Sequence, residues 1–356
     1  MRGTDGRFKR ILMVRSREQQ GAGRFKRPRR SADALAAAEA RGECTAVHEP
    51  RKPQPGKAHN EFNKGLWLCD KDVGAAIAHH RHAAWLDPTF ARVHVCLGEL
   101  LFTDPKHKDH AGAERAFRKA IRLDPGDADA HLYLGFLLQD VEGDHGGAEQ
   151  EYRTATRCST SARTLAEAHR ALGHLLQHER KDVGGAEIAY RAAIAADPSF
   201  AAAHVSLGRL LHFERKDLDH AESAYRDAIA ADPKCAVAHH GLAVVFIERK
   251  DVAGAESALR AAIAADPNCA LAHCTMGNLL YDEHKDVAGA ESAYRDTIAA
   301  DPKFADEHNN LGVLLEQERN DVTGAEGAYR DAIAADPKFA EARNNLKYLL
   351  NNMKKF

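Results

Sequence analysis

The chain has 356 residues, of which 44% are hydrophobic and 29% charged, so it is long enough to bury a sizeable core. No apolar run approaches the roughly 18 residues that cross a bilayer, which excludes an integral membrane protein. The formal net charge is −2, but residues 1–57 carry 15 Lys and Arg against 6 Asp and Glu. The rest carries 35 Lys and Arg against 46 Asp and Glu, so this acidic part should favour neutral or basic ligands.

The seven cysteines form no C-x-x-C pair, and their number is odd. This pattern excludes a zinc ribbon and a disulfide framework, and it favours a reducing compartment.

Residues 1–57 form a basic extension. They contain two Gly-Arg-Phe-Lys-Arg copies, and their high charge predicts disorder, with a short helix over 32–40. The Arg-rich start also suits an organelle transit peptide, and the run from Lys26 to Arg30 suits a nuclear signal. We therefore expect a cytoplasmic protein, with nuclear and organellar locations as alternatives. Binding of nucleic acid or an acidic surface through this extension is a less favoured alternative.

From residue 58 onward the sequence repeats. Asp-Pro pairs recur at intervals of 34 to 37 residues, except for one interval of 73 that spans two units. The pairs begin at Asp87, Asp124, Asp197, Asp232, Asp266, Asp301 and Asp336. A period this regular predicts a solenoid of one repeated unit in place of two or three globular domains.

Each unit reads as two helices joined by a turn. In the unit that starts at residue 201, Ala203, Leu207 and Leu210 recur at helical spacing, and Ala221 and Tyr225 do so after the turn. Each Pro of an Asp-Pro pair ends a second helix because it lacks an N–H.

Capping and packing signals recur with the helices. An Asp that would cap the second helix, worth about 1 kcal/mol, precedes it at Asp182, Asp217, Asp251, Asp286 and Asp321. A glycine inside a helix costs about 0.8 to 1 kcal/mol of helix stability relative to alanine. Because a glycine nevertheless recurs in the first helix, we expect the second helix to approach it closely, with the recurring alanine of the second helix opposite the glycine. These glycines are Gly98, Gly135, Gly173, Gly208, Gly277 and Gly312.

In chain order, residues 58–338 predict eight units. The first, 58–88, is degenerate and caps the stack, and seven more start near residues 91, 128, 166, 201, 236, 270 and 305. The unit near residue 166 is entered through 158–164, without an Asp-Pro pair. Residues 339–356 predict a C-terminal capping helix and a tail.

The repeat resembles the tetratricopeptide repeat family. The matching residues, with counterparts in the units from 91 to 337, are Leu207, Gly208, Leu211, Ala221, Tyr225, Ala228 and Pro233. The chain departs from the family by one extra residue in most inter-helix turns and by His where an aromatic residue is common. The resemblance implies an all-α, right-handed superhelical solenoid of stacked antiparallel helix pairs, whose first helices line a concave groove.

The resemblance also implies that exposed first-helix residues bind a peptide or helix of a partner protein. The candidate groove residues are Phe102, Phe136, Arg170, His174, Val205, Arg209, His212, Phe213, His240, Val244, Ile247, Asn278, Tyr281, Asn309 and Asn344. Apolar side chains gather in the middle of this set. The amides near the C-terminal end could hydrogen-bond a peptide backbone.

Two charged patterns have structural interpretations. Glu-to-Arg pairs at i, i+4, such as Glu222 and Arg226, predict a solvated helix face and contribute about 0.2 to 0.5 kcal/mol each. One repeat position carries His, which predicts a half-buried, hydrogen-bonded ring in preference to a pH sensor. Its members are His59, His94, His131, His169, His204, His239, His273 and His308.

A second histidine cluster lies on the expected groove. His174 and His178 are four residues apart, and the register places His212 and His240 on the same face. If these rings titrate, partner affinity should change between about pH 5 and 7.5. No carboxylate or thiol completes a metal-ligand set in the sequence, so no metal is predicted.

No catalytic or cofactor motif is found, and helical pairs account for every long segment. The sequence therefore predicts a non-catalytic protein-interaction scaffold without a cofactor. The alternative is a substrate-presenting or regulatory subunit of an enzyme complex, for example with a glycosyltransferase.

Overall fold

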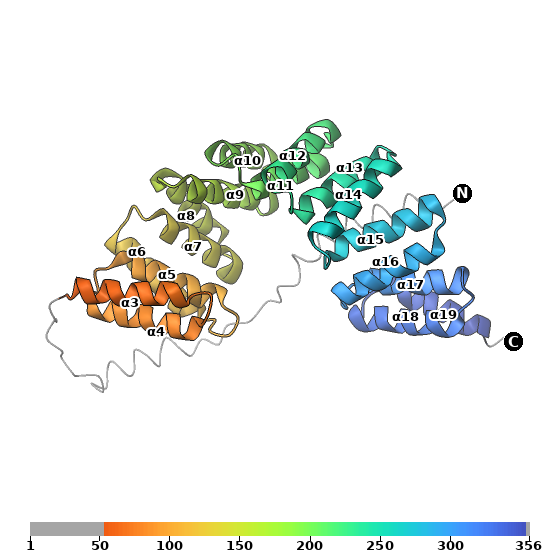
Figure 1. The fold of residues 1–356 in the computed structure, drawn as a ribbon, viewed down its shortest axis with the longest axis horizontal. Coiled ribbons are helices and arrows are strands. Elements are labelled where there is room, and N and C mark those ends of the chain that lie inside the picture. Colours follow the sequence, from red (N-terminus) through yellow and green to blue (C-terminus); the bar gives the residue numbers. More distant parts are fainter. Residues whose placement is uncertain (1–52, 354–356) are drawn as a thin grey trace. The chain divides into compact units, whose positions relative to one another are not determined.

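The computed structural model describes residues 53–353, and the predictions made for residues 1–52 lie outside this range. Within it every regular element is a helix, and each helix lies beside the one before it in the chain (Figure 1). The helices form eight pairs followed by a last helix. The predicted all-α stack of helix pairs is confirmed.

The first helices of the pairs are α3 (Pro55–Leu68), α5 (Ala91–Thr103), α7 (Ala128–Leu137), α9 (Ala162–His178), α11 (Ala201–Leu210), α13 (Ala236–Glu248), α15 (Ala270–Leu279) and α17 (Ala305–Gln317). The second helices are α4 (Val73–Leu86), α6 (His110–Leu123), α8 (His145–Cys158), α10 (Val183–Ala196), α12 (Leu218–Ala231), α14 (Val252–Ala265), α16 (Val287–Ala300) and α18 (Val322–Ala335). The last helix is α19 (Ala340–Met353).

Two helices begin earlier than the sequence predicted. Helix α3 starts at Pro55, three residues before position 58, because proline suits the first turn of a helix. Helix α9 starts at Ala162, where the side chain of Ser161 accepts a hydrogen bond from the backbone N–H of Thr164. This serine cap replaces the Asp-Pro turn that is missing at that junction.

The first helices form a layer of their own. Among the described residues, α5, α7, α9 and α11 each contact the next first helix along the chain, in addition to their own second helices, and α17 contacts α19. We call this the first-helix layer, and we call α4 to α18 (even numbers) the second-helix layer. Small residues make the close packing possible, since Ala186, Ala221 and Ala255 are fully buried between large side chains.

The two layers meet where a first-helix glycine faces an aromatic ring. A Cβ atom at Gly208 would lie 2.9 Å from the Tyr225 ring, and one at Gly312 would lie 2.6 Å from the Tyr329 ring. The predicted close approach is therefore confirmed, but the predicted partner was wrong. Tyr225 follows the recurring alanine, Ala221, by one helical turn, and its ring contacts the position of Gly208. The alanine side chain is too short to fill this space.

The inter-helix turns accommodate the extra residue. Helices α7, α11 and α15 continue into π-helical turns at Leu138–Glu142, Leu211–Arg215 and Leu280–His284. The next residue has a positive φ, for example 58° at Lys216. The backbone N–H of Asp217 then donates to the carbonyl oxygen of Leu211 at 2.9 Å, which closes the turn.

Aspartate caps every second helix, as predicted for five of them. The side chain of Asp217 accepts a hydrogen bond from the N–H of His220, and Asp182 does the same for Gly185. Asp72, Asp109, Asp144, Asp251, Asp286 and Asp321 cap in the same way.

The Asp-Pro turns are closed by the aspartate carboxylate, and five of them are also contacted by a histidine of the next helix. The carboxylate of Asp232 accepts from the N–H of Lys234 at 3.0 Å, an arrangement that the sequence analysis missed. The ring Nε2 of His239 lies 3.0 Å from the carbonyl oxygen of Pro233. The rings of His131, His204, His273 and His308 contact the corresponding proline carbonyl. The repeated histidine therefore ties the turn to the next helix, and its predicted hydrogen-bonded role is confirmed at these positions.

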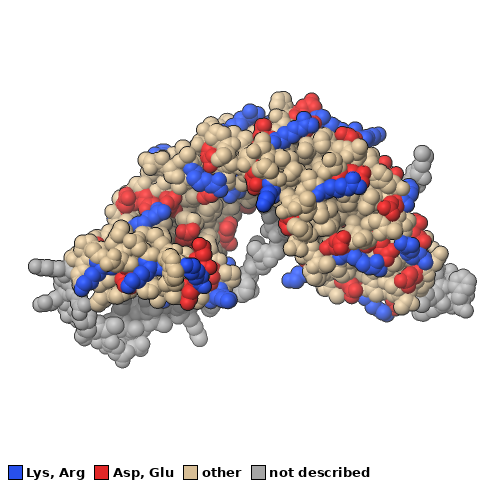
Figure 2. Space-filling view, in the orientation of Figure 1, with Lys and Arg blue, Asp and Glu red and all other residues tan. Residues whose placement is uncertain are grey.

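Ion pairs connect neighbouring units along the second-helix layer. Glu222 contacts Arg226 of its own helix at 2.7 Å and Arg249 of the next unit at 2.6 Å. Glu149, Glu187 and Glu291 each contact two arginines in the same pattern, and His284 stands in for the second arginine at Glu256. We call this the ion-pair ladder. On the face drawn in Figure 2, acidic and basic side chains lie side by side over the helices.

Candidate protein-binding face

The structure divides the candidate groove residues by burial. Six are buried: Val205, His212, His240, Val244, Asn278 and Asn309. Eight are half-buried: Phe102, Phe136, Arg170, His174, Arg209, Phe213, Ile247 and Tyr281. Asn344 is exposed. All fifteen lie on first helices, on the π-helical turns that extend them, or on α19, and their role in binding stays a prediction.

Several buried members hold the helices together. Asn278 accepts a hydrogen bond from the Tyr294 hydroxyl at 2.9 Å. His240 Nε2 lies 3.0 Å from the Thr275 hydroxyl, which joins α13 to α15. The Asn345 amide donates to Asn309 at 2.9 Å, which joins α19 to α17. These polar groups are used inside the array, so they offer a ligand less surface than the sequence suggested.

The half-buried aromatic members keep one side of their rings in contact with the array. Phe136 packs between Tyr133 and Tyr152, with ring centroids 6.2 and 5.6 Å away. Phe213 stacks on His212 at 4.2 Å. Rings held in this way offer apolar surface at little cost in conformational entropy, which suits contact with a partner.

The histidine cluster is divided between two environments. The rings of His174 and His178 on α9 lie 4.3 Å apart. Burial, together with the neighbouring His178, Arg170 and Arg209, lowers the pKa of His174 to about 4. A pKa this low disfavours titration of His174 between pH 5 and 7.5, and the pH dependence of partner affinity stays a prediction. His212 is fully buried and lies 3.0 Å from Glu248.

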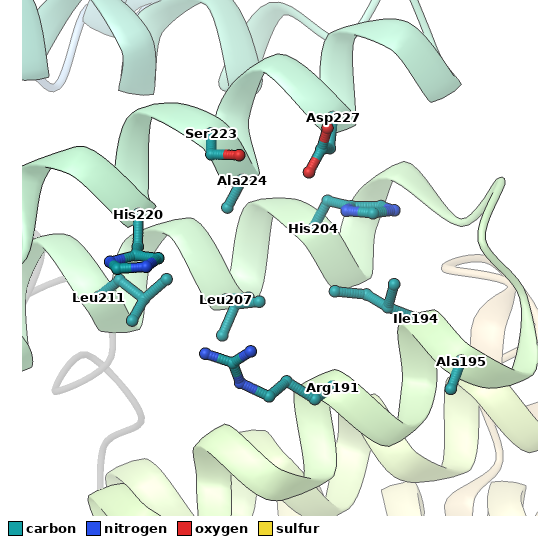
Figure 3. Close-up of a pocket in the computed structure, with 10 residues that line it drawn as sticks. All are labelled: Arg191, Ile194, Ala195, His204, Leu207, Leu211, His220, Ser223, Ala224 and Asp227. Atoms are coloured by element: carbon teal, nitrogen blue, oxygen red, sulfur yellow. The ribbon is translucent and has the colours of Figure 1, made fainter.

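A cavity of about 380 Å³ lies between α10, α11 and α12 (Figure 3). This cavity was not predicted from the sequence, and no candidate groove residue lines it. Ile194, Leu207, Leu211 and Ala224 give it apolar walls. Two of its polar lining residues have local partners: Arg191 pairs with Glu187, and the His220 ring bonds the Asp217 carboxylate.

One sequence signal marks this cavity. His220 occupies the third position of α12, where α10, α14, α16 and α18 carry glycine. The repeat therefore departs from its own pattern at the cavity wall.

Between residues 53 and 353, no helix combines the length and apolar character needed to cross a membrane. Within the same range, no three His, Cys, Asp or Glu side chains come together as a metal site would require.

Comparison with known families identifies the class of protein. Two family models, both described as tetratricopeptide repeat, match residues 212–279 and residues 106–163, 171–234 and 274–348. Together these matches span more than half of the chain. The chain belongs to the tetratricopeptide repeat family, whose arrays are typically non-catalytic and generally mediate interactions between proteins.

Solved structures agree on the fold. The chain is similar to human IFIT1, solved as a dimer with PPP-AAAA, with a TM-score of 0.59 and 17% identity over 90% of this chain and 79% of that one. It is similar to Pseudomonas aeruginosa pilF, with a TM-score of 0.52 and 23% identity over 62% and 96% of the two chains.

The C-terminal part of a TPR repeat-containing protein from Cytophaga hutchinsonii is also similar, with a TM-score of 0.50 and 16% identity over 71% of this chain and 99% of that one. At these identities the likeness shows the fold alone. No curated protein matches the chain significantly.

Proposed function

We propose that the chain is a non-catalytic scaffold that binds a peptide or helix of a partner protein on its first-helix layer. The observation that carries the proposal is the row of half-buried aromatic and apolar side chains on this layer, including Phe136, Phe213 and Ile247. They are partly open to solvent, whereas the second-helix layer carries the ion-pair ladder.

The packing of the array supports this choice of face. Glycine and alanine place neighbouring helices close together, so the first-helix side chains are held on a rigid frame. A preorganised surface binds an extended peptide with less loss of entropy than a flexible one. Aromatic rings on such a surface are the usual anchors of protein interfaces.

The test is affinity capture with the full chain and two matched variants. Phe213→Asp places a charge on the first-helix layer, and Ile188→Asp places the same charge at an exposed apolar position of α10. We expect mass spectrometry to identify proteins captured by the parent chain and by Ile188→Asp but lost with Phe213→Asp. Capture that survives Phe213→Asp and is lost with Ile188→Asp would place binding on the other layer and overturn the proposal.

A further inference from the structure

The two ends of the helical array differ in the side chains that they present to solvent. At the C-terminal end, α19 packs on α17 and α18, and no second helix follows it among residues 53–353. Lys347 of α19 occupies the register position of the recurring glycine and is exposed. A charged side chain therefore lies on the side where a further helix would pack, and polar ends of this kind keep a solenoid soluble.

The N-terminal end presents a tryptophan at its stacking position. A Cβ atom at Gly65 of α3 would lie 2.6 Å from the His80 ring, just as one at Gly98 would lie 2.5 Å from the Phe117 ring, which defines the register of α3. Trp67 follows Gly65 by two residues and is 67% exposed. The equivalent residues of five later first helices and of α19 are at most 4% exposed: Leu137, Leu175, Leu210, Leu279, Leu314 and Leu349.

This register position faces the preceding pair of helices. Helix α19 shows this clearly, because Leu349 is buried where α19 packs on the preceding helices α17 and α18. Between residues 53 and 353 no helix pair precedes α3. Trp67 therefore lies on the face by which each later unit contacts the unit before it. A large apolar side chain left in water on such a face marks a site of association.

The charges on the two sides of Trp67 have opposite signs. Lys64 lies one helical turn before Trp67. Asp70 lies one turn after it, because Cys69 keeps helical backbone angles (φ −51°, ψ −42°) at the end of α3. Lys64, Trp67 and Asp70 are all exposed, and the neighbouring Leu66 adds apolar surface. A patch with this order of charges is complementary to a second copy of itself that runs in the opposite direction.

The contacts that these side chains make within α3 and the following turn are weak. Lys64 pairs with Glu61 at 2.7 Å on the surface, and the Nζ atom of Lys71 lies 3.3 Å from the centroid of the Trp67 ring. Exposed ion pairs and exposed cation–π contacts contribute little to stability. Both lysines can therefore exchange these contacts for others when a second surface approaches.

We propose that α3 pairs in antiparallel orientation with α3 of a second copy of this chain, around a two-fold axis at Trp67. In this pairing the two tryptophan rings meet at the axis, and Lys64 of each copy faces Asp70 of the other. A parallel pairing would bring like charges together. Stacking of α3 on α19 of another copy would place Trp67 against the polar end that carries Lys347.

The pairing goes beyond the proposed scaffold function and does not depend on it. A dimer of this kind carries two first-helix layers in one assembly. A partner with two binding segments would then bind with a raised effective concentration for its second segment.

The first test measures the mass of the full chain by sedimentation equilibrium over a range of concentrations. We expect the mass to rise from the 39.0 kDa of one chain toward twice that value. Trp67→Asp should stay monomeric, whereas Trp85→Asp makes the same change at the other exposed tryptophan, on α4, and should dimerise like the parent. A parent chain that stays monomeric, or equal behaviour of the two variants, overturns the proposal.

Charge reversal tests the orientation of the pair. Lys64→Glu and Asp70→Lys each bring like charges together at two symmetric places, so each should weaken the dimer by at least about fivefold. The double variant restores opposite charges across the axis and should restore dimerisation. This rescue also separates an effect on pairing from an effect on folding. A double variant that is as weak as the single variants overturns the antiparallel pairing.

Fluorescence quenching reports directly on Trp67. The chain has two tryptophans, so Trp85→Phe leaves Trp67 as the single emitter. We expect quenching of Trp67 by iodide to fall as the chain concentration rises through the dimerisation range. A monomer in which Trp67 is already shielded from iodide would assign its cover to another part of the same chain. A dimer in which Trp67 stays open to iodide would place the interface elsewhere, and either result overturns the proposal.

Discussion

The ion-pair ladder and the middle of the first-helix layer use the same residue type in opposite ways. On the second helices, Arg226 and Arg249 share Glu222, so each charge is satisfied within the array. On α9 and α11, Arg170 and Arg209 are more buried and yet have no such partner among the described residues. Charge on the second helices therefore connects neighbouring units, whereas Arg170 on α9 contacts an aromatic ring, that of Phe200, with Cζ 5.7 Å from the ring centroid.

The C-terminal part of the first-helix layer contains a buried acidic residue, Glu307. Glu307 on α17 lies where the other units bury Ala58, Val93, Ala130, Ala168, Ala203, Ala238, Ala272 and Ala342. One oxygen of its carboxyl group is buried without a hydrogen-bond partner, and the other accepts a long contact of 3.4 Å from the Asn310 amide. Unlike Arg170, Glu307 can lose its charge by binding a proton.

The largest expected effect comes from Glu307→Gln. Burial raises the pKa of Glu307 to about 8 from an ordinary value of 4.5, so the folded chain keeps a proton that the unfolded chain releases. Stability should therefore fall as pH rises between these values, by up to about 1.4 kcal/mol per pH unit. The neutral amide removes this loss, so we expect the urea midpoint of the variant to exceed that of the parent more at pH 7.5 than at pH 5.

Glu283→Gln is the control for this prediction, because Glu283 is exposed. Its difference from the parent chain should be small at both pH values. An equal gain for Glu307→Gln at pH 5 and pH 7.5 would show that Glu307 is ionised in the folded chain, contrary to the prediction.

The contact between the two layers is tested by Gly312→Ala. The added methyl group would lie 2.6 Å from the Tyr329 ring, and the resulting overpacking should cost about 1 to 3 kcal/mol of unfolding free energy. Gly327→Ala on α18 is matched, since nothing lies within 4 Å of its would-be Cβ. That change should stabilise the helix by up to about 1 kcal/mol, and both effects are measured by urea unfolding. Equal effects of the two substitutions would contradict the close approach.

Replacing Arg170 by leucine sharpens the comparison between paired and unpaired arginines. Loss of a half-buried charge that has no carboxylate partner should raise the unfolding free energy by about 1 kcal/mol, because leucine buries well at this position in α7. Arg115→Leu on the surface of α6 should change it by less than about 0.5 kcal/mol. A fall in the urea midpoint for Arg170→Leu would mean that the arginine stabilises the array through a contact of its own.

The smallest effect is expected in the ion-pair ladder. Glu222→Ala removes the shared partner of Arg226 and Arg249 and should cost about 0.5 to 1 kcal/mol at low ionic strength. Added salt should reduce this cost, since the pairs lie near the surface. Ser223→Ala, at the exposed neighbouring position, serves as the control. If the loss of unfolding free energy does not change with salt, the effect comes from packing and not from charge.

Much of the fold could be predicted from the chain because its signals are local and repeated. The capping role of Asp217 follows from its place before a helical pattern, and the period of the Asp-Pro pairs defines the unit. The role of Tyr225 opposite Gly208 could not be read in the same way, since the contact joins residues from two helices. The extra turn residue was visible, but its π-helical conformation and the positive φ of Lys216 depend on how the next helix packs.

The candidate site was predicted only in part, because contacts between different helices cannot be read from the local sequence pattern. The sequence by itself determined which side of each helix belongs to the first-helix layer, because helical spacing and the repeat register are properties of the chain alone. Only the tertiary structure decided which of those side chains remain open: it buries Asn278 against Tyr294 and Asn309 against Asn345, and it leaves Arg170 and Arg209 half-buried. Burial and pairing depend on the neighbours that folding brings together, so net charge and periodicity could not separate an arginine paired with a carboxylate from one that is not.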